Sequence, residues 1–300
     1  MKRMSLSRSA RQILEGYLLI SPSLIVIFAI VIFPLGYLVV SSIYGWSFGR
    51  MAEFVGLKNY INVFQDPDFL TVFKNTLVFS LVSSCIELLL GLGIASLLDR
   101  SGKFEGTLRI IVVMPFMVSM VAGSVSFKWI LNAEFGIVNY SLIKLGLIRS
   151  LVNWLGSPML GMLACITVIT WHTTPFVALI LLAGLKSIPR DLYEVSELDG
   201  AGMYQKFLFI TLPLLKPAIF VSLLIRTMYS LRNFPIPYVL TGGGPGNSTK
   251  LMAMLLQEKK IQLLFGYNSA LSIIMVIVTL IIVWAYVKGL RVELIGKGKI

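Results

Sequence analysis

Six long apolar runs constrain this chain more than any other feature. They lie near residues 17–42, 75–98, 108–130, 159–184, 217–240 and 267–288. Each has the length of about 20 residues that a helix needs to cross a hydrocarbon core of about 30 Å, whereas barrel strands would alternate over about ten. Because 57% of residues are apolar and 13% charged, we predict an all-α integral membrane protein, with residues 1–300 forming a single transmembrane domain of six helices.

The start of the chain and its basic residues indicate how it crosses the membrane. The first apolar run follows Lys2, Arg3, Arg8 and Arg11, but it is longer than a signal peptide's core and no small-residue cleavage pattern closes it, so we interpret it as an anchor. With the N-terminus inside, cytoplasmic segments hold 15 Lys and Arg and the outer loops hold 9. This bias predicts a multi-pass protein with both termini in the cytoplasm.

The remaining composition excludes several function classes. The net charge of +12 comes from basic residues at membrane boundaries. This placement favours contact with membrane lipid and indicates that the chain does not bind nucleic acid. Cys85 and Cys165 fall inside apolar runs, without metal spacing or a disulfide framework. One His and few acids offer no catalytic site and no metal site. A phosphate-binding loop is also absent, since residues 242–250 lack the Gly-Lys-Ser/Thr order, so if ATP drives this protein, another chain hydrolyses it.

The charged segment 185–216 between the fourth and fifth runs has the pattern of a cytoplasmic helix-turn-helix. Ser187 and Pro189 suit the start of a first helix and Gly200 suits its end. A second short helix is expected from Ala201 until Pro213 interrupts it. Apolar residues recur at helical spacing at Ile188, Leu192, Val195, Leu198, Met203, Phe207 and Ile210. These stripes are consistent with packing on the protein's own helices, with the lipid interface, or with docking of a partner.

The sequence from Tyr193 to Gly202, followed by Ile210-Thr211-Leu212-Pro213, closely resembles the EAA loop of permease subunits of binding-protein-dependent ABC importers. Glu194, Gly200 and the Ile-x-Leu-Pro group have that loop's spacing, whereas Val195 and Ser196 replace its two alanines. The resemblance implies a type I importer permease and a loop that couples to an ATPase. The implied coupling residues are Tyr193, Glu194, Val195, Ser196, Asp199, Gly200, Ala201 and Gly202.

Other segments narrow the resemblance to the carbohydrate, or maltose-type, permeases. These are Tyr238–Thr249, Val55–Tyr60 and Phe73–Thr76. The resemblance implies a bacterial inner-membrane complex containing a second homologous permease, two cytoplasmic ABC ATPases that bind ATP and Mg, and a periplasmic or lipid-anchored solute-binding protein. It also implies that this chain binds no cofactor and imports a sugar or oligosaccharide by alternating access.

A polar helix face inside the fifth run is a candidate substrate pathway. Arg226 lies roughly 13 Å deep, where an unpaired charge facing lipid costs at least about 2.5 kcal/mol. The polar residues near it are Ser222, Tyr229, Ser230, Asn233 and, nearer the outer surface, Arg232. Such a face is expected of a helix that lines a cavity. The alternative for Arg226 is an internal ion pair with Glu87 of the second run, which lies at a compatible depth.

A second polar patch surrounds Pro175 in the fourth run. Trp171 is a candidate for stacking on a sugar ring and His172 for bonding its hydroxyls, but the hydroxyls here also suit carbonyls freed by a proline kink. If Arg226 and Arg232 both face the pathway, an acidic saccharide becomes a better candidate than a neutral one. Importers of glycerol phosphate or another small solute remain alternatives. An ion-coupled secondary transporter is a weaker one, because the halves show no internal repeat.

Overall fold

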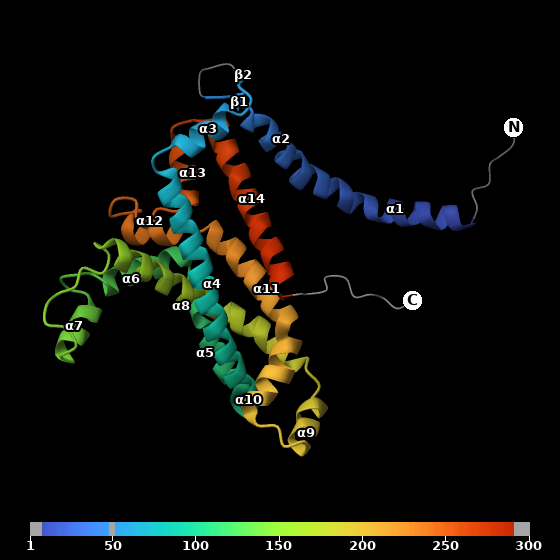
Figure 1. Cartoon of the computed structure of the whole chain (residues 1–300), viewed down its shortest axis with the longest axis vertical. Coiled ribbons are helices and arrows are strands. Elements are labelled where there is room, and N and C mark those ends of the chain that lie inside the picture. Colours follow the sequence, from blue (N-terminus) through green and yellow to red (C-terminus); the bar gives the residue numbers. More distant parts are fainter. Residues whose placement is uncertain (1–7, 48–51, 291–300) are drawn as a thin grey trace. The chain divides into compact units, whose positions relative to one another are not determined.

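The computed structural model describes residues 8–47 and 52–290, which are predominantly helical (Figure 1). The chain divides into two compact units. One contains the residues up to Gln65 together with Lys259–Ile274, and the other contains Asp66–Glu258 and the residues from Met275 onward.

The first unit contains a long helical stretch, followed by a small β-hairpin and a short helix. Helix α1 (Arg8–Ile27), the π-helical turn η1 (Phe28–Ile32) and α2 (Phe33–Ser42) follow one another directly, and a hairpin of β1 (Tyr44–Gly45) and β2 (Glu53–Phe54) precedes α3 (Lys58–Gln65). The side-chain amide of Asn59 donates hydrogen bonds of 2.8 Å to the carbonyls of both Ser42 and Tyr44. Asn59 thereby fixes α3 against the end of α2.

The second unit contains most of the remaining helices. They are α4 (Phe69–Arg100), the 3-10 turn η2 (Gly102–Phe104), α5 (Glu105–Met117), α6 (Met120–Ile130), α7 (Ile137–Lys144), α8 (Pro158–Lys186), α9 (Asp191–Leu198), α10 (Met203–Lys206), the π-helical turn η3 (Phe207–Thr211), α11 (Leu212–Leu231) and α12 (Pro235–Thr241). Helices α13 (Met252–Ile261) and α14 (Phe265–Leu290) each have residues in both units.

Five helical stretches of the described residues are long and apolar enough to cross a membrane. They are Gly16–Ser42, Phe69–Arg100, Pro158–Lys186, Met203–Leu231 and Phe265–Leu290. The pair formed by Gly102–Met117 and Met120–Ile130 is bent by 87° and makes a sixth span if it is counted as one. The predicted fold class, an all-α membrane protein of the six-span type, is confirmed.

Two of the six predicted runs differ from the helices of the structure. The third is broken at Val118 and Ser119, where the backbone is extended, and Pro115 lies in the last turn before the break. The fifth begins at Met203 and ends at Leu231, instead of running from 217 to 240. The sequence predicts that Pro213 interrupts the second short helix of the loop. In the structure Pro213 follows the π-helical turn η3 and occupies the first turn of α11. Its missing amide hydrogen costs little in this position.

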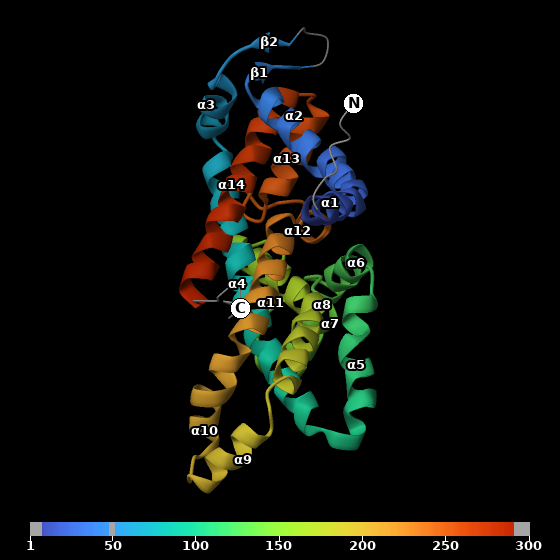
Figure 2. The same ribbon diagram turned by 90° about the vertical axis from the view of Figure 1, so that its right-hand side faces the viewer.

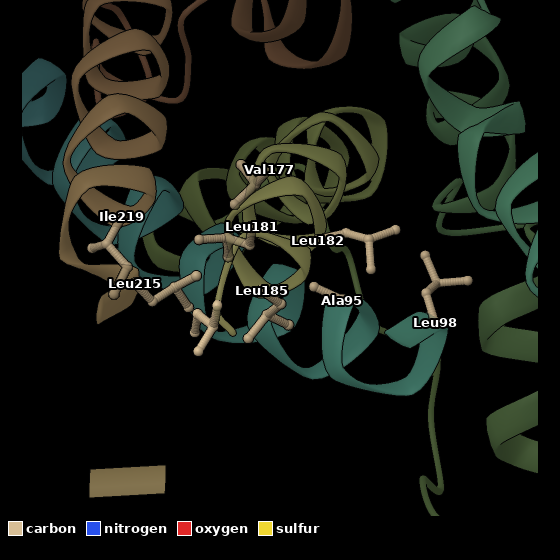
Figure 3. Packing of buried hydrophobic residues seen from close by; sticks show 9 residues of the cluster. Ala95, Leu98, Val177, Leu181, Leu182, Leu185, Leu215 and Ile219 are labelled. Carbon is tan, nitrogen blue, oxygen red and sulfur yellow. The ribbon is translucent and has the colours of Figure 1, made fainter. Parts of the chain in front are cut away.

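The centre of the second unit is a close packing of α4, α8 and α11. Leu181, Leu185 and Leu215 meet in its main apolar cluster (Figure 3). At Gly184 an added Cβ would lie 2.6 Å from the Cβ of Ala218, so a side chain at this position would force α8 and α11 apart. Small residues at such contacts let membrane helices approach closely. This packing fixes the ends of α8 and α11, from which the loop with α9 projects (Figure 2).

Candidate functional site

The loop between α8 and α11 has the predicted helix-turn-helix form, and its turn depends on Gly200. The amide of Gly200 donates to the carbonyl of Glu197 at 3.0 Å, and that of Ala201 donates to Ser196 at 2.9 Å. These two bonds form a Schellman cap, in which the residue at the glycine position adopts a left-handed conformation. Gly200 has φ +79°. A residue with a Cβ is strained there, which explains the glycine.

Further bonds hold α9 against α10 and the start of α11. The amide of Gly202 donates to Oε1 of Gln205 at 2.8 Å, and Lys206 pairs with Glu197 at 2.5 Å. The hydroxyls of Tyr193 and Thr211 lie 2.9 Å apart. Movement of α9 is therefore coupled to the base of α11.

The apolar stripe of this loop is turned outward. Leu198 is 89% exposed, and Leu192, Val195, Met203 and Tyr204 are exposed as well. Ile188, at the start of the loop, is buried against the cluster shared by α4, α8 and α11. Of the alternatives that the sequence left open, packing of the whole stripe on the protein's own helices does not occur in the described structure. We call the residues from Asp191 to Met203 the coupling knob.

The base of the coupling knob carries an ion pair that sequence reasoning missed. Nζ of Lys186, in the last turn of α8, lies 2.6 Å from both carboxylate oxygens of Glu105 at the start of α5, and Arg109 also pairs with Glu105. The i, i+4 spacing of Glu105 and Arg109 was a usable signal, but the approach of Lys186 depends on the tertiary packing.

Inside the membrane region, Arg226 of α11 is paired with Glu87 of α4. Nε of Arg226 lies 2.6 Å from Oε2 of Glu87, and Nη2 lies 3.1 Å from Oε1. The side chains are 3% and 0% exposed. The hydroxyl of Thr173 from α8 donates to Oε1 of Glu87 at 2.8 Å. The structure thus contains the internal ion pair that was the structural alternative for Arg226.

Part of the polar face also packs against α4, where the sequence led us to expect the lining of a cavity. Thr227 donates to the hydroxyl of Ser84 at 3.3 Å, and Ser83 donates to Ser230 at 3.4 Å. Tyr229, at 60%, is exposed. The physical reason is that polar groups of a neighbouring helix can form the hydrogen bonds that a polar face inside a membrane needs, just as water can. Arg232, whose Nε donates to the Met228 carbonyl at 3.3 Å, is exposed like Tyr229.

Trp171 and His172 lie beside the break between α5 and α6. Trp171 is 36% exposed and packs edge-on against Phe127 of α6, with ring centroids 5.2 Å apart. His172 is buried, and its Nε2 lies 2.9 Å from the carbonyl of Val118 at the break. A hydrogen bond to this carbonyl requires the proton on Nε2, so His172 satisfies a backbone group that the bent helix leaves free.

The break is also held by a residue between α11 and α12. The amide of Asn233 donates to the sulfur of Met120 at 3.4 Å, and its oxygen accepts from the amide of Ile236 at 3.4 Å at the start of α12. His172 and Asn233, which were both candidates for contact with substrate, are buried around the break. Trp171, Tyr229 and Arg232 remain as the exposed candidates.

Two of the segments that carried the carbohydrate-permease resemblance meet in space. The side chain of Asn75 near the start of α4 donates to the carbonyls of Asn247 and Lys250, at 2.8 and 3.2 Å. Asn247 in turn donates to Asp68 at 2.8 Å. Burial alone would lower the pKa of Lys250, but Glu258 and Asp68 raise it above its ordinary value of 10.5. Hydrogen bonds therefore fix the glycine-rich segment after α12 against the start of α4.

The architecture defines a multi-pass helical membrane protein, and comparison with known proteins places it in a family. The model of the binding-protein-dependent transport system inner membrane component matches residues 87–287. The chain therefore belongs to this family of membrane permease subunits from transport systems.

Individual proteins are similar over nearly the whole chain. The sulfoquinovosyl glycerol transport system permease protein SmoG of Agrobacterium fabrum is 37% identical over 93% of this chain and 91% of its own length. The trehalose/maltose transport system permease protein MalF of Thermococcus litoralis is 40% identical over 91% of this chain and 92% of its own. Among solved structures, a chain of a bacterial ABC transporter that imports the acidic polysaccharide alginate has a TM-score of 0.76 at 25% identity, covering 95% of this chain and 99% of that one.

Proposed function

We propose that this chain is the non-catalytic permease subunit of an ATP-driven importer for a sugar or oligosaccharide. The relatives named for a sulfoquinovosyl glycerol and for trehalose and maltose, with the structural similarity to the alginate importer chain, support the substrate class. The observation that carries the proposal is the family match over residues 87–287.

In this proposal residues 1–300 form one transmembrane domain, and residues 185–216 are its cytoplasmic coupling segment. The partners are a second homologous permease, two ABC ATPases that bind ATP and Mg, and a solute-binding protein on the outer side. Both termini lie in the cytoplasm of a cell whose inner membrane holds the complex. The excess of Lys and Arg on that side supports this orientation.

The coupling knob is the element that meets an ATPase. Its exposed apolar residues offer a contact, with Leu198 at 89% exposure the most prominent, and Glu194 and Asp199 add charge beside them. Because Tyr193 is bonded to Thr211 and Lys206 to Glu197, a displacement of the coupling knob moves the base of α11. That is the mechanical link which alternating access requires.

Gly200→Val tests this link, because a β-branched residue at positive φ disturbs the turn at a cost of about 1–2 kcal/mol. The matched control is Gly146→Val, at φ +71°, since neither glycine has another atom within 4 Å of an added Cβ. In proteoliposomes containing the whole complex, Gly200→Val should abolish ATP-driven uptake while Gly146→Val retains it. Equal uptake by the two variants contradicts the role of the coupling knob.

For the substrate pathway we propose contacts by the exposed residues Trp171, Tyr229 and Arg232, while Arg226, Ser230, Asn233 and His172 position the helices that carry them. Of these two arginines only Arg232 still favours an acidic substrate, because Glu87 neutralises Arg226. A panel of neutral and acidic saccharides, presented with the binding protein, should stimulate ATP hydrolysis by the complex with one class preferred. Stimulation by glycerol phosphate or amino acids, and by no saccharide, would overturn the substrate class.

Trp171→Ala tests the pathway within that assay. It should reduce sugar-stimulated ATP hydrolysis several-fold, because stacking of an aromatic ring on the sugar would be lost. Trp129→Ala removes another exposed tryptophan, on α6, and should leave the activity unchanged. Identical activities of the two variants would exclude sugar contact by Trp171.

A further inference from the structure

The segment of residues 131–157, which joins α6 to α8 and contains α7, is organised around one buried polar side chain. Asn139 of α7 is 1% exposed. Its Nδ2 donates to the carbonyls of Ala133 and Val152 at 2.8 and 2.9 Å. Its Oδ1 accepts from the amide of Val152 at 3.3 Å and from the indole of Trp154 at 2.9 Å. One buried amide thus satisfies the backbone and the indole around it.

The same segment turns its apolar side chains outward. Leu145 is 71% exposed and Leu147 is 69% exposed. Other exposed apolar residues of the segment are Phe135, Ile137, Tyr140 and Leu151. A loop that faces water normally has the opposite arrangement, with polar side chains outside. Polar groups satisfied within the segment and apolar groups outside are what a hydrocarbon environment demands, because lipid offers backbone groups no hydrogen bonds.

The position of α7 and its flanking residues favour lipid over a protein partner. The segment begins at the end of α6 and ends at α8, and both helices belong to stretches that are long and apolar enough to cross a membrane, α6 together with α5. Both views show α7 at a level shared with part of α5 (Figures 1 and 2). Lys144 and Arg149 lie beside the exposed leucines, and Nζ of Lys144 lies 5.9 Å from the ring centroid of Tyr140. Aromatic and basic residues around an apolar surface are typical of the boundary between acyl chains and phosphate headgroups.

We propose that α7 and the residues that follow it to Leu151 are a lipid-binding surface of this permease. In this arrangement Leu145 and Leu147 enter the acyl-chain region of a phospholipid leaflet. Lys144 and Arg149 reach the headgroup phosphates of the same leaflet. The surface lies on the opposite side of the membrane from the coupling knob, since α8 crosses between them.

The test uses nitroxide labels in the assembled complex in phospholipid nanodiscs. Leu147→Cys and, as a second position, Tyr140→Cys are labelled in a background in which Cys85 and Cys165 are alanine. Collision of each label with oxygen, which concentrates in lipid, and with a water-soluble nickel chelate is measured by electron paramagnetic resonance. Gln257→Cys, at an exposed polar position of α13, is the aqueous control.

The proposal predicts an oxygen-to-nickel collision ratio at Leu147 and Tyr140 several-fold higher than at Gln257. Labels that collide with nickel as freely as the control would place the segment in water and overturn the proposal. Labels shielded from both reagents would place a protein partner on this surface, such as the second permease, and would overturn it as well. Because both substituted side chains are exposed, the labels require no rearrangement of the protein's interior.

Discussion

Glu87→Gln removes the carboxylate from the ion pair between α4 and α11. The guanidinium of Arg226 then has no anion within its buried site, where it is 3% exposed. The glutamine retains one oxygen for the 2.6 Å contact but turns an NH2 donor toward a second donor, Nη2. Breaking one partner of a buried pair costs about 3–5 kcal/mol, because an uncompensated charge remains.

The expected loss of stability can be measured as a lower midpoint temperature of thermal unfolding for the purified complex in a mild detergent. Since 1 kcal/mol shifts the midpoint of a large chain by about 2 °C, the single variant should melt about 6 °C or more below the wild type. The double variant Glu87→Gln, Arg226→Met should recover most of that loss, because removing both charges is often nearly neutral. Glu134→Gln controls for the change of residue type at an exposed position. A midpoint for Glu87→Gln within 1 °C of the wild type, or a double variant no better than the single, would refute the energetic role of the pair.

Two further predictions follow from the packing and the surface charges. Gly184→Ala should destabilise the complex by about 1–3 kcal/mol, because its Cβ would lie 2.6 Å from that of Ala218, whereas Gly93→Ala meets nothing within 4 Å and should be neutral or slightly stabilising in the same melting assay. Burial alone would lower the pKa of Lys250, but Glu258 and Asp68 raise it, so the stability that this ammonium contributes is present below its ordinary pKa of 10.5 and is lost as pH rises through the raised value. The melting difference between wild type and Glu258→Gln should therefore shrink above pH 10.5, and a difference that grows there would contradict this origin.

Much of this fold could be predicted because its strongest signals are local. Apolar runs of membrane length indicate spans whatever their neighbours are, and Gly200 indicates its turn because the left-handed cap is a property of a few consecutive residues. The break at Val118 could not be predicted in the same way. Its backbone carbonyl is satisfied by His172, a residue 54 positions later in the sequence. Pro115 alone is compatible with a kink, a break or a continuous helix.

What the polar face of α11 contacts also depends on tertiary structure. Helical spacing correctly places Arg226 and Ser230 on one side, but spacing does not tell whether that side meets a cavity or another helix. The matching depth of Glu87 was the informative signal, because it named a partner for the charge. Tyr229 and Arg232 are exposed in the structure, so the pathway residues proposed here are fewer than the polar residues of the helix.

Recovery of the partners of this chain from native membranes tests most directly whether it is the permease of an ATP-driven importer. Wild type and Leu198→Asp are purified in mild detergent, and the retained proteins are quantified by mass spectrometry. Because Leu198 is 89% exposed, its replacement should leave the fold intact. We expect the wild type to retain an ABC ATPase and a second permease, and Leu198→Asp to retain the permease but to lose most of the ATPase. A wild-type preparation without any ATPase, under conditions that preserve other membrane complexes, would contradict the claim that this chain is the permease of an ATP-driven importer.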